Sequence, residues 1–207
     1  MRPDEFADRF PTLYHAAWPE ARERIAREGL MSPLAICESL GMSAPDTEAV
    51  LTTRRAKITA LRPDVILNDN SPLQEGPLRR ALPPELSPQD WMRALNSRVF
   101  LFTKLREAEA FARAAASRDR ARDIWAFDTA ALARSHFDRL EITPFNTGAT
   151  TRRPPLRDLS TFAKVAETDF EDWRSRRIRA GIKTGRDTVR EVCVFHSAPG
   201  VSGVRIV

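Results

Sequence analysis

The segment from Pro11 to Leu30, PTLYHAAWPEARERIAREGL, constrains the fold most, because a strand signal is followed at once by a well-bounded helix. The short apolar stretch ends in Tyr14 and His15. Pro19 stands in the first helical turn, where proline is tolerated best, and Gly29 supplies the left-handed residue that commonly ends a helix. A strand joined directly to a helix predicts a mixed α and β structure.

Strand and helix patterns recur along the rest of the chain without regular alternation. Arg98–Thr103, RVFLFT, has the clearest strand pattern, because it is short, apolar and aromatic. Further strands are expected at Asp123–Asp128, Asp187–His196 and Gly203–Val207, and helices at Ser43–Leu61, Leu105–Ala116, Thr129–His136 and Phe170–Ile178. Ser32-Pro33 and Ser87-Pro88 mark two more helix starts, whereas residues 68–84 are expected to form a polar turn and a proline-rich connection.

This irregular order favours an α+β fold with a mixed or antiparallel sheet. We expect a single domain over residues 1–207, in which residues 1–10 form a lead-in. No internal repeat and no glycine-rich fingerprint are present, which argues against a Rossmann domain and against a P-loop.

The apolar runs and the cysteines of the chain indicate the cellular compartment to expect. The 207 residues suffice for one large domain with a core, and they contain no apolar run of the roughly 18 residues that a membrane span needs. The opening MRPDEFADRF lacks the apolar run of a secretory signal. Cys37 and Cys193 are too few and too far apart for a zinc site or a disulfide framework. We therefore expect no membrane association and a reducing cytoplasm.

The charge balance is moderately basic. The 33 Lys and Arg residues against 28 Asp and Glu give a formal net charge of +5 and an isoelectric point of about 9.8. An arginine-rich surface attracts anions such as nucleic acid, an acidic partner or a dinucleotide. A net charge of this size admits nucleic-acid binding without requiring it.

Two ionisable groups in apolar surroundings are candidates for chemistry. His15 follows Tyr14 at the end of the first strand, although a lone strand histidine is more often structural than catalytic. Glu191 stands in REVCV at the start of an apolar strand, where a carboxylate facing a cleft can have its pKa tuned. A solvent-facing glutamate at a sheet edge is an equal alternative for Glu191.

The stretch Asn146-Thr147-Gly148 offers an amide, a hydroxyl and exposed main chain, which suit ribose or phosphate oxygens. A plain polar turn before the following prolines is the alternative. No Ser-His-Asp order or nucleophile elbow is visible, and no His, Cys and carboxylate cluster has metal-ligand spacing. We therefore expect no bound metal.

Three segments, LYHAAWPEARERIAREGL, LNSRVFLFT and REVCVFHSAPGV, together resemble the layout of the ADP-ribosyltransferase fold. The resemblance is nearest to the DNA-modifying ADP-ribosyltransferase toxins of bacterial toxin–antitoxin pairs, and it runs from about Pro11 to Val201. Ser71-Pro72-Leu73, Leu95–Leu101 and Asn146–Thr150 also resemble motifs of an uncharacterised bacterial family related to these toxins.

The resemblance implies NAD as a substrate and a role for each matching residue. His15 would hydrogen-bond a ribose of NAD, whereas Phe102 and Thr103 would lie beside the nicotinamide. Glu191 would fix the nicotinamide ribose and activate the acceptor, with Glu167 and Glu171 as competitors for this role. The residues that would bind the cofactor are Tyr14, His15, Arg98, Phe102, Thr103, Asn146 and Thr147, and those that would act in catalysis are Glu191 and His15.

The expected function is therefore NAD-dependent transfer of ADP-ribose, with a nucleic-acid base as one acceptor. DNA or RNA and an antitoxin protein are the partners that the resemblance implies. Two alternatives stay open from the residues alone. One is a non-catalytic module that binds a nucleotide or a partner on the same fold. The other is a basic nucleic-acid-binding protein that acts through its arginines.

Overall fold

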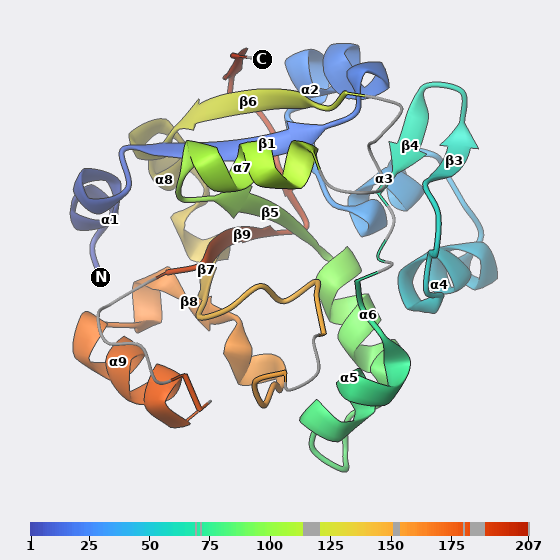
Figure 1. Cartoon of the computed structure of the whole chain (residues 1–207). Helices are drawn as coiled ribbons and strands as arrows, with labels where there is room; N and C mark the ends of the chain where they lie inside the picture. The colour runs from blue at the N-terminus through green and yellow to red at the C-terminus, as the bar shows by residue number, and fades with distance from the viewer. Residues whose placement is uncertain are drawn as a thin grey trace.

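The centre of the molecule is an antiparallel sheet (Figure 1). A computed structural model describes residues 1–68, 70, 72–113, 121–150, 154–179, 181–182 and 189–206. The strands of the sheet are β1 Thr12–Ala17, β5 Arg98–Phe102, β6 Asp123–Asp128, β7 Leu140–Thr143, β8 Ala163–Lys164, β9 Glu191–Phe195 and β11 Gly203–Arg205. Within the described residues these seven strands pair in the order β11–β6–β1–β5–β9–β7–β8. The predicted α+β class, with an antiparallel sheet, is confirmed.

Two small ribbons and a set of short helices surround the sheet. The ribbons pair β2 Leu30–Met31 with β10 Ser197–Ala198 and β3 Thr59–Arg62 with β4 Val65–Leu67. The helices are α1 Pro3–Arg9, α2 Arg22–Glu28, α3 Pro33–Ser39, α4 Ala44–Thr52, α5 Glu75–Ala81, α6 Pro88–Asn96, α7 Leu105–Ala112, α8 Thr129–His136 and α9 Phe170–Arg179. The 3₁₀ turns are η1 Pro19–Ala21, η3 Phe137–Arg139, η4 Leu159–Thr161 and η5 Val165–Glu167.

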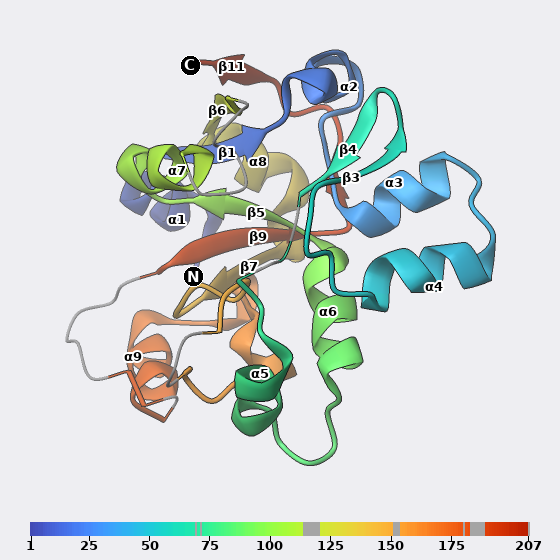
Figure 2. The ribbon, with the colours of Figure 1, turned by 45° about the vertical axis from the view of Figure 1, so that its right-hand side comes forward.

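The helices cover both faces of the sheet. Helix α7 lies in front of β1 and β5 in Figure 1, whereas α8 lies behind them. The turned view in Figure 2 shows α3, α4 and the β3–β4 ribbon standing together beyond one end of the sheet, next to α6. No helix in the described ranges is both long and apolar enough to span a bilayer.

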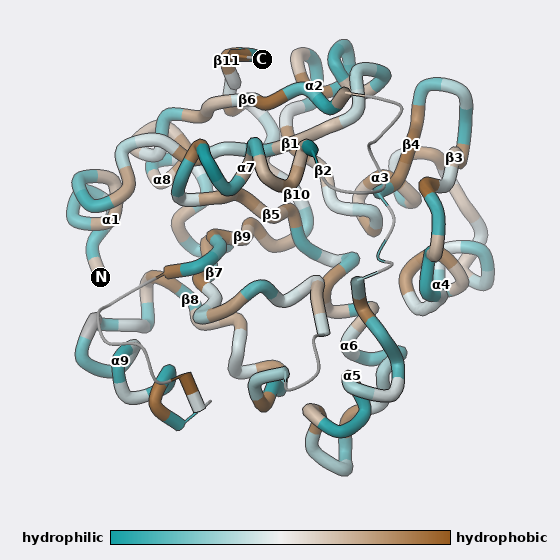
Figure 3. The backbone as a smooth tube through the Cα atoms, viewed as in Figure 1, coloured by the Kyte–Doolittle hydropathy of each residue, from teal (hydrophilic) through white to brown (hydrophobic). Residues whose placement is uncertain are grey.

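The core follows the alternation of side chains along the central strands. Val99 and Leu101 of β5 pack with Val192 and Val194 of β9 in the larger hydrophobic cluster. The opposite face carries a second cluster built from α5, α6 and neighbouring residues: Leu73, Leu78, Trp91, Met92, Leu95, Phe162 and Cys193. Figure 3 shows mostly hydrophobic colouring along β5 and β9, and stretches of hydrophilic colouring on outer helices such as α1. Because both faces of these strands are covered, their sequences are almost continuously apolar.

Several local predictions are confirmed. Ser87 and Asp90 form the predicted capping box, in which Ser87 Oγ accepts from Asp90 N at 3.1 Å and Asp90 Oδ2 accepts from Ser87 N at 3.0 Å. Ser32 caps α3 by accepting from Ala35 N at 3.2 Å. The predicted bounds of the strand Asp123–Asp128 and of the helix after it hold without change.

The predicted helix over Ser43–Leu61 is wrong beyond Thr52. Helix α4 ends at Thr52, and Thr59–Arg62 forms strand β3 instead. The side chain of Arg55 ties this segment to its neighbours, because it donates to Val50 O at 2.9 Å and to Asn68 O at 3.0 Å. These tertiary contacts, together with β-branched residues that favour strands, override the helical pattern.

Two elements have weaker sequence signals than the rest. Helix α5 lies in the stretch expected to be a proline-rich connection, and its Pro77 occupies the first turn, where proline is tolerated. Strand β7 is four residues long and contains Glu141, so its apolar pattern is broken. The predicted continuations of the helix to Ala116 and of the late strand back to Asp187 run into residues outside the described ranges.

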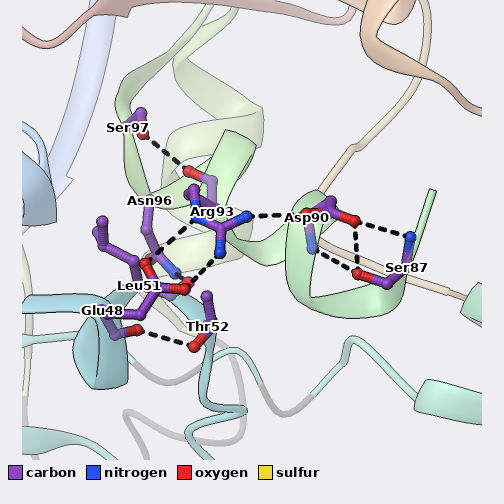
Figure 4. Close-up of polar contacts among 8 residues, drawn as sticks. All are labelled: Glu48, Leu51, Thr52, Ser87, Asp90, Arg93, Asn96 and Ser97. Atoms are coloured by element: carbon purple, nitrogen blue, oxygen red, sulfur yellow. Dashed lines mark hydrogen bonds and ion pairs between the residues drawn. The ribbon is translucent and has the colours of Figure 1, made fainter. Parts of the chain in front are cut away.

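Polar contacts hold α4 against α6, whose last residues line the cavity described below (Figure 4). Arg93 of α6 pairs with Glu48 of α4 and with Asp90, 2.8 Å away on its own helix. Asn96, at the end of α6, donates to Leu51 O at 2.7 Å. Asn96 also accepts from Arg55 Nη2 at 2.8 Å, so the end of α4, the following segment and α6 are held together.

Gly29 is a position where a side chain would not fit. Its backbone has φ +77° and ψ −158°, and an added Cβ would lie 2.2 Å from Ala198 O. We expect Gly29→Ala to lower the free energy of unfolding by about 2 kcal/mol, because the conformation is strained for L residues and the clash is with main chain. Urea denaturation would measure this loss. Gly41 has φ +64° with nothing within 4 Å of its added Cβ, so Gly41→Ala is the matched control. Equal losses in the two variants would contradict the clash.

Candidate functional site

Four residues stand opposite one another on neighbouring strands of the central sheet. Tyr14 of β1 is in register with Phe102 of β5, Phe102 with Glu191 of β9, and Glu191 with Thr143 of β7. Residues directly opposite each other in an antiparallel sheet project from the same face. The fold therefore brings segments that are far apart in the sequence into one row, with Glu191 inside the sheet rather than at a solvent-facing edge.

Glu191 is a buried carboxylate whose two oxygens have different surroundings. Oε2 accepts three hydrogen bonds, from Thr147 Oγ1 at 2.8 Å, from Thr147 N at 3.1 Å and from Thr143 Oγ1 at 3.0 Å. The single proton of the Thr143 hydroxyl is shared with Phe145 O, which is also 3.0 Å from Oγ1. No hydrogen bond among the described residues reaches Oε1. Burial raises the pKa of Glu191, and the hydrogen bonds from Thr147 and Thr143 oppose that shift. The carboxylate is thus held firmly by one oxygen and leaves the other to a ligand.

Glu191 borders a cavity of about 390 Å³. The cavity lies between the end of β1, the segment from η1 through α3, strand β4, the end of α6, strand β5 and residues 146–149. Among the residues predicted to form the site, those that line the cavity are His15, Arg98, Phe102, Asn146, Thr147 and Glu191. The volume falls within the range of small-molecule sites, which are largely apolar with a few placed polar groups.

His15 lies where β1 and β5 separate. Within the described residues the two strands are in register at one pair, Tyr14 and Phe102. The His15 ring lies against the main chain of β5, with Nδ1 2.9 Å from Phe100 O. A carbonyl oxygen can only accept, so Nδ1 carries the proton and Nε2 is left as an acceptor. Burial lowers the pKa of His15, which favours this neutral form at pH 7.

Aromatic rings and an arginine form one wall of the cavity. The rings of Phe102 and Phe111 have centroids 5.6 Å apart. The guanidinium of Arg122 lies 4.5 Å from the centroid of Phe111 and 4.3 Å from that of Trp18. The faces of aromatic rings and of a guanidinium are flat surfaces, against which a planar ligand group can be held.

The segment 146–149 forms another part of the lining. Asn146 is exposed, and its Oδ1 accepts from Gly148 N at 3.1 Å, which makes a polar turn. Thr147 is buried and supplies two of the three donors to Glu191. The carbonyl of Thr147 accepts from Trp91 Nε1 and from Arg157 Nη1, each at 3.3 Å. The polar turn predicted here is therefore also part of the support of Glu191.

Arg98 lines the cavity, but its guanidinium is committed to an ion pair. Its Nε and Nη2 donate to the two oxygens of Glu141 at 2.5 and 3.0 Å, and Nη1 donates to Ala94 O at 2.7 Å. The guanidinium also lies 4.0 Å from the ring centroid of Phe162. These contacts hold the guanidinium against Glu141 and α6, and the cofactor-binding role expected for Arg98 from the sequence stays a prediction.

Two further predicted cofactor residues do not line the cavity. Tyr14 shares the row with Phe102, and helix α7 packs against β1 beside it. Thr103 follows the end of β5, and its hydroxyl donates to Val189 O at 3.5 Å. The competing glutamates lie elsewhere: Glu167 is exposed and pairs with Lys164 at 3.1 Å, and Glu171 is exposed at the start of α9. Of the three glutamates, Glu191 is the one at the cavity.

Sequence reasoning did not single out Arg122 or Arg157. Both guanidiniums are buried, with residue exposures of 4% and 2%. An arginine-rich chain offers many basic residues, and no local pattern marks these two. Across the described residues no group of three His, Cys, Asp or Glu side chains converges on a common point that could hold a metal ion.

The fold and this geometry define an α+β protein with a buried carboxylate at the wall of a small-molecule-sized cavity. The chain belongs to DUF7002, a family of unknown function whose model matches residues 11–204. The match covers the sheet from β1 into β11 and all the cavity-lining residues. No curated protein and no solved structure matches the chain.

Proposed function

We propose that this chain is an NAD-dependent ADP-ribosyltransferase in which Glu191 is the catalytic carboxylate. The observation that carries the proposal is the state of that side chain. A buried carboxylate, fixed through one oxygen by three donors and open at the other, borders a cavity that also contains His15 and Phe102. Burying a carboxylate that is not fully paired lowers the stability of the fold. Such groups are found most often at functional sites, which favours a functional role for Glu191.

The charge of the cavity suits an anionic ligand. Among the described lining residues, Arg24, Arg55, Arg98 and Arg122 are cationic and Glu191 is the one carboxylate. Arg24 pairs with Glu28 and Asp64, and Arg98 with Glu141, all of these acidic partners lying outside the lining. Guanidinium groups suit the pyrophosphate of a dinucleotide, and the aromatic wall suits a planar base or nicotinamide ring.

Glu191 can serve both halves of the transfer. The bond between the ribose C1′ and the nicotinamide nitrogen breaks, and its electron pair leaves with neutral nicotinamide. The carboxylate stabilises the positive charge that develops at C1′, as a fixed anion in a water-poor site does well. An acceptor nitrogen or oxygen then bonds to C1′, and its proton passes to Glu191, whose raised pKa suits a general base. A nucleic-acid base is the proposed acceptor, since the net charge of +5 favours a polyanion.

The deciding experiment is incubation of the purified protein with NAD, alone and with single- and double-stranded DNA and RNA. Free nicotinamide and the mass of each nucleic acid are measured together, beside the Glu191→Gln protein. Nicotinamide release that depends on Glu191 supports the enzyme, and the mass of the modified nucleic acid identifies the acceptor. Co-expression with the neighbouring genes of its source genome would then test whether the enzyme is toxic and has an antitoxin partner.

Other outcomes would favour the alternatives. A thermal shift with NAD but no nicotinamide release would leave a nucleotide-binding module on the same fold. Nucleic-acid binding that weakens steeply with salt and ignores NAD would favour a basic nucleic-acid-binding protein. If the protein shows no thermal shift with NAD and no nucleic-acid binding at any salt concentration, the NAD proposal is rejected.

His15 gives a separate prediction about NAD binding. We expect His15→Phe to raise the KM for NAD about tenfold, because a ribose hydroxyl would lose the acceptor Nε2 while the apolar volume is kept. Steady-state kinetics would show this with a smaller change in kcat. His136 is a buried histidine that bonds Pro199 O at 2.9 Å, away from the cavity lining, so His136→Phe is the control. An unchanged KM in the His15 variant would exclude ribose binding by His15.

A further inference from the structure

Arg157 is a buried guanidinium held mainly by main-chain carbonyls. Its Nη1 donates to Thr147 O at 3.3 Å and to Ala149 O at 3.4 Å, and its Nε donates to Pro155 O at 3.4 Å. The remaining nitrogen, Nη2, is buried without a hydrogen-bond partner, and no ion pair in the described part of the chain involves this residue. Burial lowers the pKa of Arg157 to about 10, and the charge of Glu191 opposes that shift. A cation in such surroundings is unfavourable for folding, so its presence calls for another explanation.

The contacts of Arg157 lead directly to the candidate catalytic carboxylate. The carbonyl of Thr147 accepts from Arg157, while the amide and hydroxyl of the same residue donate to Glu191. Trp91 donates to the same carbonyl, and the Arg157 guanidinium lies 5.4 Å from the Trp91 ring centroid and 4.9 Å from that of Phe145. Thr147 is therefore fixed on one side by an arginine and an indole and holds the carboxylate on the other.

We propose that Arg157 is a positioning residue, which clamps residues 147–149 so that Thr147 keeps the open oxygen of Glu191 directed at the cavity. This inference rests on the proposed function, because it assigns Glu191 the catalytic role. Arg157 is not itself a lining residue of the cavity. It acts in two ways, by the hydrogen bonds that place Thr147 and by a positive charge that favours the ionised form of the carboxylate.

Other charged groups surround this pair and stay unchanged in the test. Arg190 precedes Glu191 in the chain, and its Nη1 donates to Glu107 Oε1 of α7 at 2.6 Å. The other charged groups are the Arg98–Glu141 ion pair on β5 and β7 and Asp158, which follows Arg157 in the chain. A change in the titration of Glu191 on altering Arg157 alone is therefore assigned to Arg157.

The test compares Arg157→Met, Arg157→Lys and Trp91→Phe with the wild-type protein, in the NAD assay from about pH 4 to about pH 9. Arg157→Met removes both the hydrogen bonds and the charge. We expect a fall in kcat of about tenfold or more, a KM within about twofold, and an acid limb shifted upward by about one pH unit. Arg157→Lys keeps the charge but loses the rigid planar fork and the Nε donor to Pro155 O, so the carbonyls of residues 147–149 are held less rigidly, kcat falls and the acid limb stays. Trp91→Phe removes the second donor to Thr147, and kcat falls less, without a shift of the acid limb.

An acid limb that does not move in Arg157→Met, or a loss confined to KM, would overturn the positioning role. Wild-type kcat in Arg157→Lys would overturn the clamp, and it decides the question if the methionine variant does not fold. NMR titration of the ¹³C-labelled Glu191 carboxyl gives a second measurement that needs no turnover. A protein inactive toward NAD whose Glu191 titration still moves in Arg157→Met would reject the proposed function and keep the Arg157–Glu191 linkage.

Discussion

The Glu191→Gln protein is expected to bind NAD and to release nicotinamide about 100- to 1,000-fold more slowly than the wild type. Glutamine keeps the shape of the side chain, and its carbonyl oxygen can accept the hydrogen bonds from Thr143 and Thr147. The negative charge at the cavity is lost, so positive charge at the ribose carbon is no longer stabilised. Nicotinamide release over time, with NAD binding followed by thermal shift, would measure the two effects separately.

The same substitution is expected to raise thermal stability at neutral pH. The folded-state pKa of Glu191 is raised by burial, so the stabilising contribution of its protonated form is present below the ordinary pKa of glutamate and is lost as the pH rises through the folded-state pKa. Glutamine does not ionise, so the variant does not lose this stabilising contribution as the pH rises. We expect a rise in Tm of roughly 2–4 °C above the folded-state pKa, shrinking toward zero in acid. A glutamine variant that is less stable at all pH values would show that the carboxylate serves the fold.

Replacing Arg98 with methionine is expected to cost about 3–5 kcal/mol of unfolding free energy, because Glu141 would remain buried without its cation. The side chains of the pair are 12% and 9% exposed, and the guanidinium bonds both carboxylate oxygens. Chemical denaturation would measure the loss. The double variant Arg98→Met with Glu141→Leu should recover most of it, because an apolar pair replaces the ion pair.

Arg93 provides the control for Arg98. It pairs with Glu48 and Asp90 on the surface (Figure 4), where its side chain is 41% exposed, so Arg93→Met should cost less than about 1 kcal/mol. If Arg98→Met instead leaves stability unchanged and raises the KM for NAD tenfold or more, Arg98 contacts the cofactor as its position in the sequence implied.

The sequence predicted most elements whose signals are local. The capping box at Ser87 and Asp90, the strand at Asp123–Asp128 and the proline-led helix start at Ser32-Pro33 depend on neighbouring residues, and all are present. The extended helix over Ser43–Leu61 failed because the contacts of Arg55 lie far from it in the sequence, on Asn68 and Asn96. Local propensity carries no information on such partners.

The residues of the candidate site also fall into those that local sequence patterns indicate and those that depend on distant partners. His15, Phe102 and Glu191 stand on strands with readable patterns, so the strands that carry them could be anticipated, although the order of these strands in the sheet could not. The contacts of Arg98 and Thr147 could not be anticipated either, because each depends on a partner on another strand or loop: Glu141 for Arg98, and Glu191 for Thr147. Arg122 and Arg157 are marked only by burial, which composition does not reveal.

The position of β9 in the sheet has a consequence for how the protein is made. Strand β9 follows all but one of the other strands of the sheet in the chain, yet it is inserted between β5 and β7, and it carries Glu191. A growing polypeptide would expose the unpaired edges of β5 and β7 until β9 leaves the ribosome. The carboxylate thus arrives with the strand that joins β5 to β7, so no chain that stops before β9 holds a finished site.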